Sequence, residues 1–122
     1  MVDSLKINVI GGGPGGLYFS ILMKLANPKH QITVYEQNKS NDTFGFGVVF
    51  SDETLENFMG QDPITYQEIK NQFAYWDQIE VRYRGERIRS RGHGFAGMAR
   101  MTLMNIFQKR CIDLGVNINY ET

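Results

Sequence analysis

The sequence contains few of the residues from which disulfides and metal sites are built, and it has no excess of charge. Its single cysteine, Cys111, excludes an internal disulfide, and its two histidines lie too far from that cysteine to give the spacing of a metal site. Thirteen basic and thirteen acidic residues cancel, so the net charge favours neither nucleic acid nor an anionic membrane. No apolar stretch reaches the length of a membrane span. We therefore expect a cytoplasmic protein with no metal, no nucleic-acid partner and no membrane partner.

Length and hydrophobic content suit one small globular domain. The chain has 122 residues, of which 42% are hydrophobic, and a domain of this size buries roughly two thirds of the surface of its unfolded chain. Cys111 falls on one helical stripe with Leu103, Phe107 and Leu114, so we expect it to pack in the core as a small apolar residue.

A glycine-rich turn between two predicted β-strands is the most informative feature of the sequence. An apolar strand begins at Lys6, the run Gly-Gly-Gly-Pro-Gly-Gly follows at 11–16, and a helical pattern then leads to a second strand over residues 31–36. This order is the fingerprint of a βαβ unit that binds a dinucleotide. Glycine turns without a ligand are common, but here strand, glycines, helix, second strand and a final acid all appear in sequence, which favours binding.

Each residue of the turn has an expected role. Gly11 allows the tight turn off the strand, Gly13 lets the backbone approach a pyrophosphate, and Gly16 lets the helix pack closely on the sheet. Pro14 suits the first helical turn, because its missing N–H removes a donor that had no partner within the helix. The free amides of that turn, which includes Gly15, are expected to hold the phosphates.

Glu36 ends the second strand, twenty residues after Gly16. This is the separation expected of an acid that accepts hydrogen bonds from the ribose of an adenosine. A carboxylate there would repel the additional phosphate of NADP, so the site favours FAD or NAD.

The rest of the chain predicts further helices and strands of an α/β protein. Only three strands, near Lys6, Gln31 and Asn117, suit a parallel sheet. We therefore expect a Rossmann-like FAD-binding βαβ unit with an inserted β-hairpin, in an incomplete doubly wound parallel sheet. Its unpaired edge invites self-association or pairing with another chain. Two helices are predicted in the middle of the chain: one over 52–60, capped by Ser51 or Asp52, and one that begins with a capping box of Thr65 and Glu68 and ends at about Tyr75. A β-hairpin follows, in which residues 79–83 pair with a strand through Ile88 and Arg89. The last predicted elements are a helix over 101–114 and a strand over 116–120.

Two glycines and an arginine outside the turn are further candidates for cofactor binding. Gly45 and Gly47 suit either a buried strand or a backbone kept bare so that a flat ring can lie against it. Arg100 stands where a helix begins, and a cation at the positive end of a helix dipole is unfavourable unless an anion lies between them. We expect Arg100 to contact a cofactor phosphate, with a solvated arginine as the alternative.

Five of the seven arginines lie on the predicted hairpin. Such a run is commonly a solvated face of a sheet, and its functional alternative is a cradle for a polyanionic substrate such as the phosphates of coenzyme A. Nucleic acid is disfavoured because Glu80 and Glu86 interrupt the run. His93 falls in a predicted flexible loop over 92–95, where it would either carry a proton or bond to the backbone. The substrate candidates are Arg87, Arg89 and His93.

Three segments of the chain resemble the N-terminal part of the single-component (group A) FAD-dependent aromatic monooxygenases, a class of oxidoreductases. They are VIGGGPGGLYF at 9–19, GFGVVFSD at 45–52 and GHGF at 92–95. The likeness extends through nearly the whole chain and is to the hydroxylases of salicylyl-CoA and anthraniloyl-CoA in particular. Many FAD and NAD proteins share the first segment, whereas the second is far more specific.

The resemblance implies an FAD with its adenosine on residues 11–36 and its flavin ring near 45–51, which include Gly45, Gly47 and Val48, with Arg100 also in contact. In such enzymes NAD(P)H reduces the flavin, and oxygen is then used to hydroxylate an aromatic or acyl-CoA substrate. The later Asp-Gly and Gly-Asp motifs of the family do not occur here. Residues 1–122 are thus expected to be a partial FAD/NAD(P)-binding domain, in which we assign no catalytic acid or base.

Two other functions compete with this one. The chain would alternatively be a stand-alone adenine-dinucleotide-binding module that a partner or self-association completes. A flavin reductase of the geranylgeranyl type shares the glycine motif, but it should lack the run at 45–52.

Overall fold

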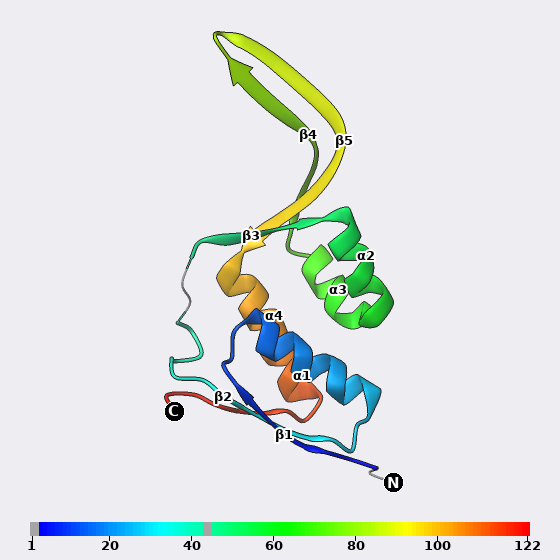
Figure 1. Ribbon diagram of the computed structural model, residues 1–122, viewed down its shortest axis with the longest axis vertical. Coiled ribbons are helices and arrows are strands. Elements are labelled where there is room, and N and C mark those ends of the chain that lie inside the picture. Colours follow the sequence, from blue (N-terminus) through cyan, green and yellow to red (C-terminus); the bar gives the residue numbers. More distant parts are fainter. Residues whose placement is uncertain (1–2, 43–44) are drawn as a thin grey trace. The chain divides into compact units, whose positions relative to one another are not determined.

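The computed structural model describes residues 3–42 and 45–122, which form two compact units (Figure 1). The parallel-sheet unit consists of the chain up to Phe46 together with Arg100–Thr122. The hairpin unit consists of Gly47–Ala99.

The parallel-sheet unit is built on three parallel strands in the order β1-β2-β6. Strand β1 (Lys6–Ile10) pairs along its full length with β2 (Gln31–Tyr35), and β2 pairs on its other side with β6 (Asn117–Asn119). β-branched residues dominate β2, as strand formation favours. The predicted βαβ unit and its parallel sheet are therefore confirmed.

Helix α1 (Pro14–Ala26) joins β1 to β2, and α4 (Arg100–Asp113) leads to β6. Proline stands at the start of α1, as predicted. The two helices pack against each other on the same side of the sheet (Figure 1). The ring of Tyr18 stacks on that of Phe107 with centroids 5.5 Å apart. Cys111 is fully buried in this layer, as expected.

Alternation in β2 shows that only one face of the sheet is covered within the described residues. Ile32 and Val34 are buried, while Gln31 is exposed and Thr33 and Tyr35 are half-buried. A doubly wound sheet buries its strands on both faces. On the edge, β1 pairs with β2 alone among the described strands, and Ile10 is 83% exposed. The expectation of an incomplete parallel sheet is confirmed.

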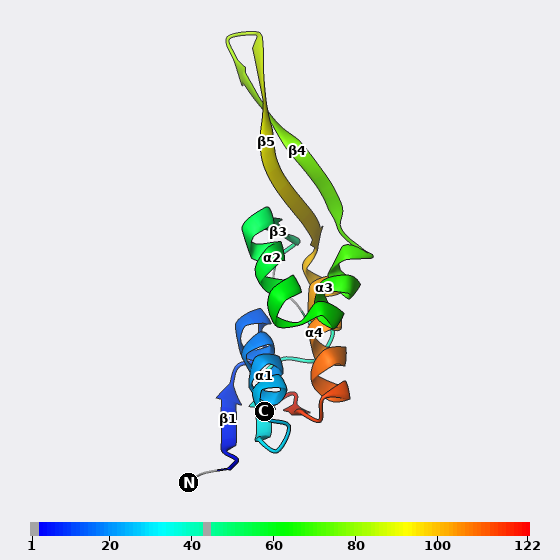
Figure 2. The same cartoon turned by 90° about the vertical axis from the view of Figure 1, so that its right-hand side faces the viewer.

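The hairpin unit is an antiparallel sheet with two short helices beside it. Its strand order is β3-β5-β4, and the hairpin of β4 and β5 extends beyond the helices as a twisted two-stranded ribbon (Figure 2). Ser51 caps its first helix, with Oγ accepting a hydrogen bond from the N–H of Thr54 at 3.3 Å. The elements are β3 (Gly47–Ser51), α2 (Asp52–Gln61), α3 (Pro63–Lys70), β4 (Ala74–Tyr83) and β5 (Glu86–Ala99).

The prediction for the second helix of this unit was wrong at both ends. Helix α3 begins at Pro63 rather than with Thr65 as its cap, and the Thr65 hydroxyl donates instead to the buried carboxylate of Asp62. The helix ends at Lys70, so Tyr75 lies in β4. Pairing of β4 with the long β5 satisfies backbone groups that a helix would otherwise bond, and this outweighs local propensity.

The second strand of the hairpin is also longer than predicted. It continues past Arg89 to Ala99, so the residues 92–95 are a strand and not a flexible loop. The reason is tertiary, since β3 and β4 pair with this part of β5 from its two sides. The backbone of His93 belongs to β5, but its side chain lies outside the described part of the chain.

Candidate dinucleotide-binding site

The glycine turn follows β1 with the geometry that its sequence predicts. Gly11 has φ +106°, a region that favours glycine, and its N–H donates to the carbonyl oxygen of Tyr35 at 2.8 Å. Gly16 packs so closely on the turn that an added Cβ would overlap the carbonyl oxygen of Gly11 and approach Val9 Cγ1 to 3.2 Å. The turn is thereby held against both strands, and no residue larger than glycine fits at position 16.

The first turn of α1 is open at its N-terminal end. Gly13 is the N-cap, and no side chain caps the helix there. A Cβ added at Gly13 or Gly15 would have no atom within 4 Å, so nothing described fills the space beside these residues. Backbone N–H groups at such a helix end lack partners within the helix and attract an anion.

Glu36 turns its carboxylate toward this turn. Its Oε1 accepts a hydrogen bond from the N–H of Gly12 at 3.2 Å, and its Oε2 accepts from the N–H of Asn38 at 2.9 Å and from Asn38 Nδ2 at 3.2 Å. The hydrogen bond from the Asn38 backbone is the main cause that lowers the pKa of Glu36 below its ordinary value of 4.5, against the opposing effect of partial burial. The carboxylate is therefore ionised at neutral pH and fixed beside the glycines.

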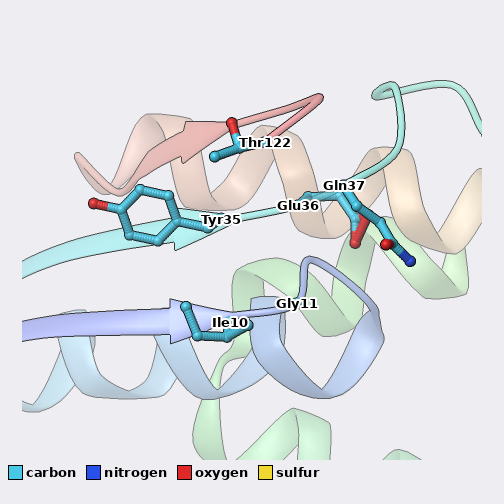
Figure 3. Close-up of a pocket in the computed structure, with 6 residues that line it drawn as sticks. All are labelled: Ile10, Gly11, Tyr35, Glu36, Gln37 and Thr122. Atoms are coloured by element: carbon cyan, nitrogen blue, oxygen red, sulfur yellow. The ribbon is translucent and has the colours of Figure 1, made fainter.

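A hollow of about 590 Å³ opens at the carboxyl ends of β1 and β2, next to Glu36 (Figure 3). Ligands of open α/β sheets bind at this end of the strands. The side chains of Ile10 and Tyr35 supply apolar walls, and the Glu36 carboxylate supplies an acceptor. The hollow is lined by Ile10, Gly11, Tyr35, Glu36, Gln37 and Thr122.

A second, smaller cleft of about 70 Å³ joins the glycine turn to the start of α4. It places Arg100 with Gly12, Gly13 and Glu36, which lie far from it in the sequence. The Nε of Arg100 is buried and has no hydrogen-bond partner among the described residues. Gly45 lies nearby, since an added Cβ there would be 3.6 Å from Arg100 Cδ. The remaining lining residues are Asn38, Lys39, Asp42, Met104, Gln108 and Tyr120.

Five predicted site residues belong to the hairpin unit instead, and one of them, His93, has its side chain outside the described part of the chain. Gly47 and Val48 begin β3, where a Cβ at Gly47 would be only 3.1 Å from the carbonyl oxygen of Met98. Close pairing of β3 with β5 is thus one reason for a glycine at this position. Arg87 and Arg89 lie on β5, each with its Nε 3.6 Å from Glu80 Oε1.

Sequence reasoning did not find Asn38, whose N–H and amide both bind the Glu36 carboxylate. No residue pattern signalled it, because the shorter of these bonds comes from a backbone N–H, which every residue except proline carries. Gln108 and Tyr120 line the smaller cleft but lie far along the chain. No local pattern identifies them, since only the packing of α4 against α1 and the pairing of β6 with β2 bring them there.

The described part of the chain offers neither a helix suited to a membrane nor a cluster suited to a metal ion. None of its helices combines the length and the apolar character that crossing a membrane requires. It also contains no group of three or more histidine, cysteine, aspartate or glutamate side chains that could hold a metal ion.

The chain is similar in sequence to monooxygenases of aromatic substrates. It is 43% identical over 117 residues to a salicyloyl-CoA 5-hydroxylase of Streptomyces sp., an alignment that covers 96% of this chain and 23% of that protein. It is 28% identical over 116 residues to a 3-hydroxy-4-methyl-anthranilyl-(aryl-carrier protein) 5-monooxygenase of Streptosporangium sibiricum, with 95% and 33% covered. No family model matches the chain.

The fold is also that of a known oxygenase. The tetrameric form of 2-methyl-3-hydroxypyridine-5-carboxylic acid oxygenase superposes with a TM-score of 0.84 at 20% identity, covering 97% of this chain and 32% of that one. The resemblance to aromatic monooxygenases inferred from the motifs is therefore confirmed. The chain spans only about a quarter to a third of the length of the curated relatives it matches.

Proposed function

We propose that this chain is the FAD-binding portion of a flavin-dependent monooxygenase that hydroxylates an aromatic or acyl-CoA substrate with NAD(P)H and oxygen. One observation carries the proposal. The Glu36 carboxylate, bonded to the N–H of Gly12, lines the same cleft as Arg100, whose buried Nε has no hydrogen-bond partner among the described residues. An acceptor for ribose hydroxyls and a cation for phosphate are the two groups that an adenosine diphosphate requires.

The residues present fit this part of FAD. Glu36 would accept hydrogen bonds from the ribose, and the open first turn of α1 would hold the diphosphate with backbone N–H groups. A buried donor without an acceptor costs about 1–3 kcal/mol, and a phosphate oxygen would supply the acceptor that the Arg100 Nε lacks. The residues assigned to the diphosphate are Gly11, Gly13, Pro14, Gly15, Gly16 and Arg100.

We assign Gly45, Gly47 and Val48 to the flavin ring, because bare or extended backbone lets a flat ring lie against it. The flavin, when bound, passes electrons from NAD(P)H to oxygen, and the protein supplies position and charge. The relatives named for salicyloyl-CoA and for a carrier-bound anthranilyl group support an aromatic thioester as the substrate. The lone cysteine accords with a reducing compartment such as the cytoplasm.

Titration of the purified chain with FAD and with FMN tests this proposal. FMN lacks the adenosine, so Glu36→Ala should weaken FAD binding about tenfold or more, as the loss of a charged hydrogen bond does, and leave FMN binding unchanged. Glu56→Ala, which removes an exposed carboxylate from α2, serves as the control. Equal FAD affinity in the Glu36 and Glu56 variants would refute the proposal.

The free edge of β1 favours a second candidate, a stand-alone dinucleotide-binding module completed by self-association. Among the described strands β1 pairs only with β2, and its last residue, Ile10, is exposed. Sedimentation of the chain with and without FAD separates the two functions. A stable oligomer that binds FAD would favour the module, whereas a monomer would count against it.

A further inference from the structure

The hairpin of β4 and β5 gathers arginines on one of its faces. Glu80 bonds to three of them, with its carboxylate oxygens 3.4 Å from Arg82 Nε and 3.6 Å from both Arg87 Nε and Arg89 Nε. Three guanidinium groups thus share one carboxylate, which leaves two positive charges in excess. We call Arg82, Arg87 and Arg89, with Glu80 between them, the arginine face.

Strand register sets two arginines against each other, and the single Glu80 carboxylate does not neutralise the three that it contacts. Arg82 lies directly opposite Arg87 across the two strands, and like charges in this relation destabilise a sheet. The side chains of Arg82, Arg87 and Arg89 are 66%, 59% and 63% exposed, so their bonds to Glu80 are weak and easily exchanged. The guanidinium groups are therefore accessible to a ligand that carries several negative charges.

The tip of the hairpin adds a strained cation. Arg84 has φ +49° and Gly85 has φ +80°, which is the conformation of a two-residue turn that favours asparagine or glycine at both places. Arginine there is strained, and its guanidinium carbon lies 5.2 Å from the centre of the Tyr83 ring. Arg84 thus adds one more positive charge at this end of the hairpin.

We propose that the arginine face binds the phosphates of a coenzyme A thioester. This proposal rests on the monooxygenase function proposed above and adds a binding site for its substrate. Alternate residues of a strand are about 7 Å apart, so Arg87 and Arg89 reach two phosphate groups of one molecule at once. Guanidinium forks bind phosphate oxygens in pairs. Coenzyme A offers a diphosphate and a separate 3′-phosphate, which together match a row of arginines better than a single phosphate does.

Nucleic acid fits this surface less well. Glu80 lies among the three arginines, and the chain as a whole carries no excess of basic residues. A long nucleic acid would also require positive charge over a wider surface than one hairpin. A compact polyphosphate needs only the few guanidinium groups that the register brings together.

Isothermal titration of the full chain with coenzyme A itself tests the proposal. Wild type is compared with the double variant Arg87→Gln/Arg89→Gln and with a control, Lys29→Gln/Lys109→Gln, which removes the same charge from exposed positions of the parallel-sheet unit. We expect the hairpin variant to bind coenzyme A about tenfold more weakly or worse and the control to stay within about twofold. Omitting the 3′-phosphate, by use of dephospho-coenzyme A, should weaken wild type more than the hairpin variant.

Equal affinity in wild type and hairpin variant would overturn the proposal, as would an equal loss in both double variants. Displacement of coenzyme A by FAD would also overturn it, because the ligand would then occupy the glycine turn. Tighter binding of an oligothymidylate would assign the surface to nucleic acid instead. FAD titration of the same samples distinguishes failure of this proposal from failure of the proposed function. Binding of coenzyme A without FAD binding that depends on Glu36 would contradict the proposed function. FAD binding that depends on Glu36, without binding of coenzyme A, would contradict only the proposal for the arginine face.

Discussion

Gly16 of α1 packs directly against the carbonyl oxygen of Gly11, in the space that a side chain at position 16 would occupy. The atom it meets is backbone, which cannot turn aside as a flexible side chain can. The close packing of α1 on the turn therefore depends on the backbone conformation of that turn.

Gly16→Ala should lower the free energy of unfolding of the parallel-sheet unit by about 1–3 kcal/mol, because overpacking moves backbone. Thermal denaturation followed by circular dichroism measures the change. Gly15→Ala is the matched control, since its added methyl group meets no atom within 4 Å and alanine is favoured over glycine within a helix. Equal melting temperatures for the two variants would contradict the close packing at Gly16.

Glu36 should make stability depend on pH in the acid range. The backbone hydrogen bond from Asn38 lowers the pKa of Glu36 below 4.5 in the folded chain, so the folded state binds its proton less readily than the unfolded state. The stabilisation is complete above the unfolded pKa and is lost as the pH falls through the folded pKa. Urea unfolding measured from about pH 6 down to about pH 3 should show that the difference in unfolding free energy between wild type and Glu36→Gln becomes smaller as the pH falls. An advantage that is constant with pH would contradict it.

Arg100→Met should separate stability from cofactor binding. Methionine keeps the apolar stem but removes a buried donor that has no partner among the residues the structure describes, so the unfolding free energy should stay level or rise by up to about 1 kcal/mol. FAD affinity should fall about tenfold or more with the loss of a charged contact to phosphate. Lys109→Met, an exposed position of the same helix, should leave FAD affinity unchanged. A less stable Arg100 variant with full FAD affinity would show that the arginine is structural.

Cys111 should be inert toward thiol reagents while the chain is folded. The side chain is fully buried, its Sγ donates to the carbonyl oxygen of Leu17 at 3.4 Å, and burial raises the pKa of the thiol from 9.0 to about 12. Reaction with a disulfide reagent should follow global unfolding, because the thiolate is the reactive form. Because the thiol ionises at a lower pH in the unfolded chain than in the folded chain, the free energy of unfolding should also fall as the pH rises above about 9. Rapid labelling without denaturant would contradict this burial.

The helix and strand boundaries show where local pattern was sufficient. Proline at the start of α1 and Ser51 as the cap of α2 act within a few residues of chain; the proline was predicted, and Ser51 was one of the two predicted caps. The predicted extension of α3 to Tyr75 failed, because those residues pair with a part of β5 more than twenty positions away. Backbone groups bond to the partner that the whole fold offers, and a short window of sequence does not contain that partner.

The candidate site divides in the same way. Gly11, Gly16 and Glu36 were identified from their spacing in the sequence, because all three belong to one βαβ unit, in which the separation along the chain fixes where each residue lies. The dipole argument singled out Arg100, but its neighbours in the cleft followed only from the packing of α4 against the turn. The arginine face was visible as a cluster in sequence, whereas the sharing of Glu80 by three of its members required the register of two strands.

By itself, the sequence determined the glycine turn, the acid that ends β2 and the likeness to aromatic monooxygenases, because these depend on residue type and on separations along one stretch of chain. The tertiary structure alone decided which separate elements meet: Arg100 with the glycine turn, Gln108 and Tyr120 with the smaller cleft, and Arg82 with Arg87 across the hairpin. Hydrogen bonds and charges act over a few ångströms of space, and folding sets those distances independently of separation along the chain.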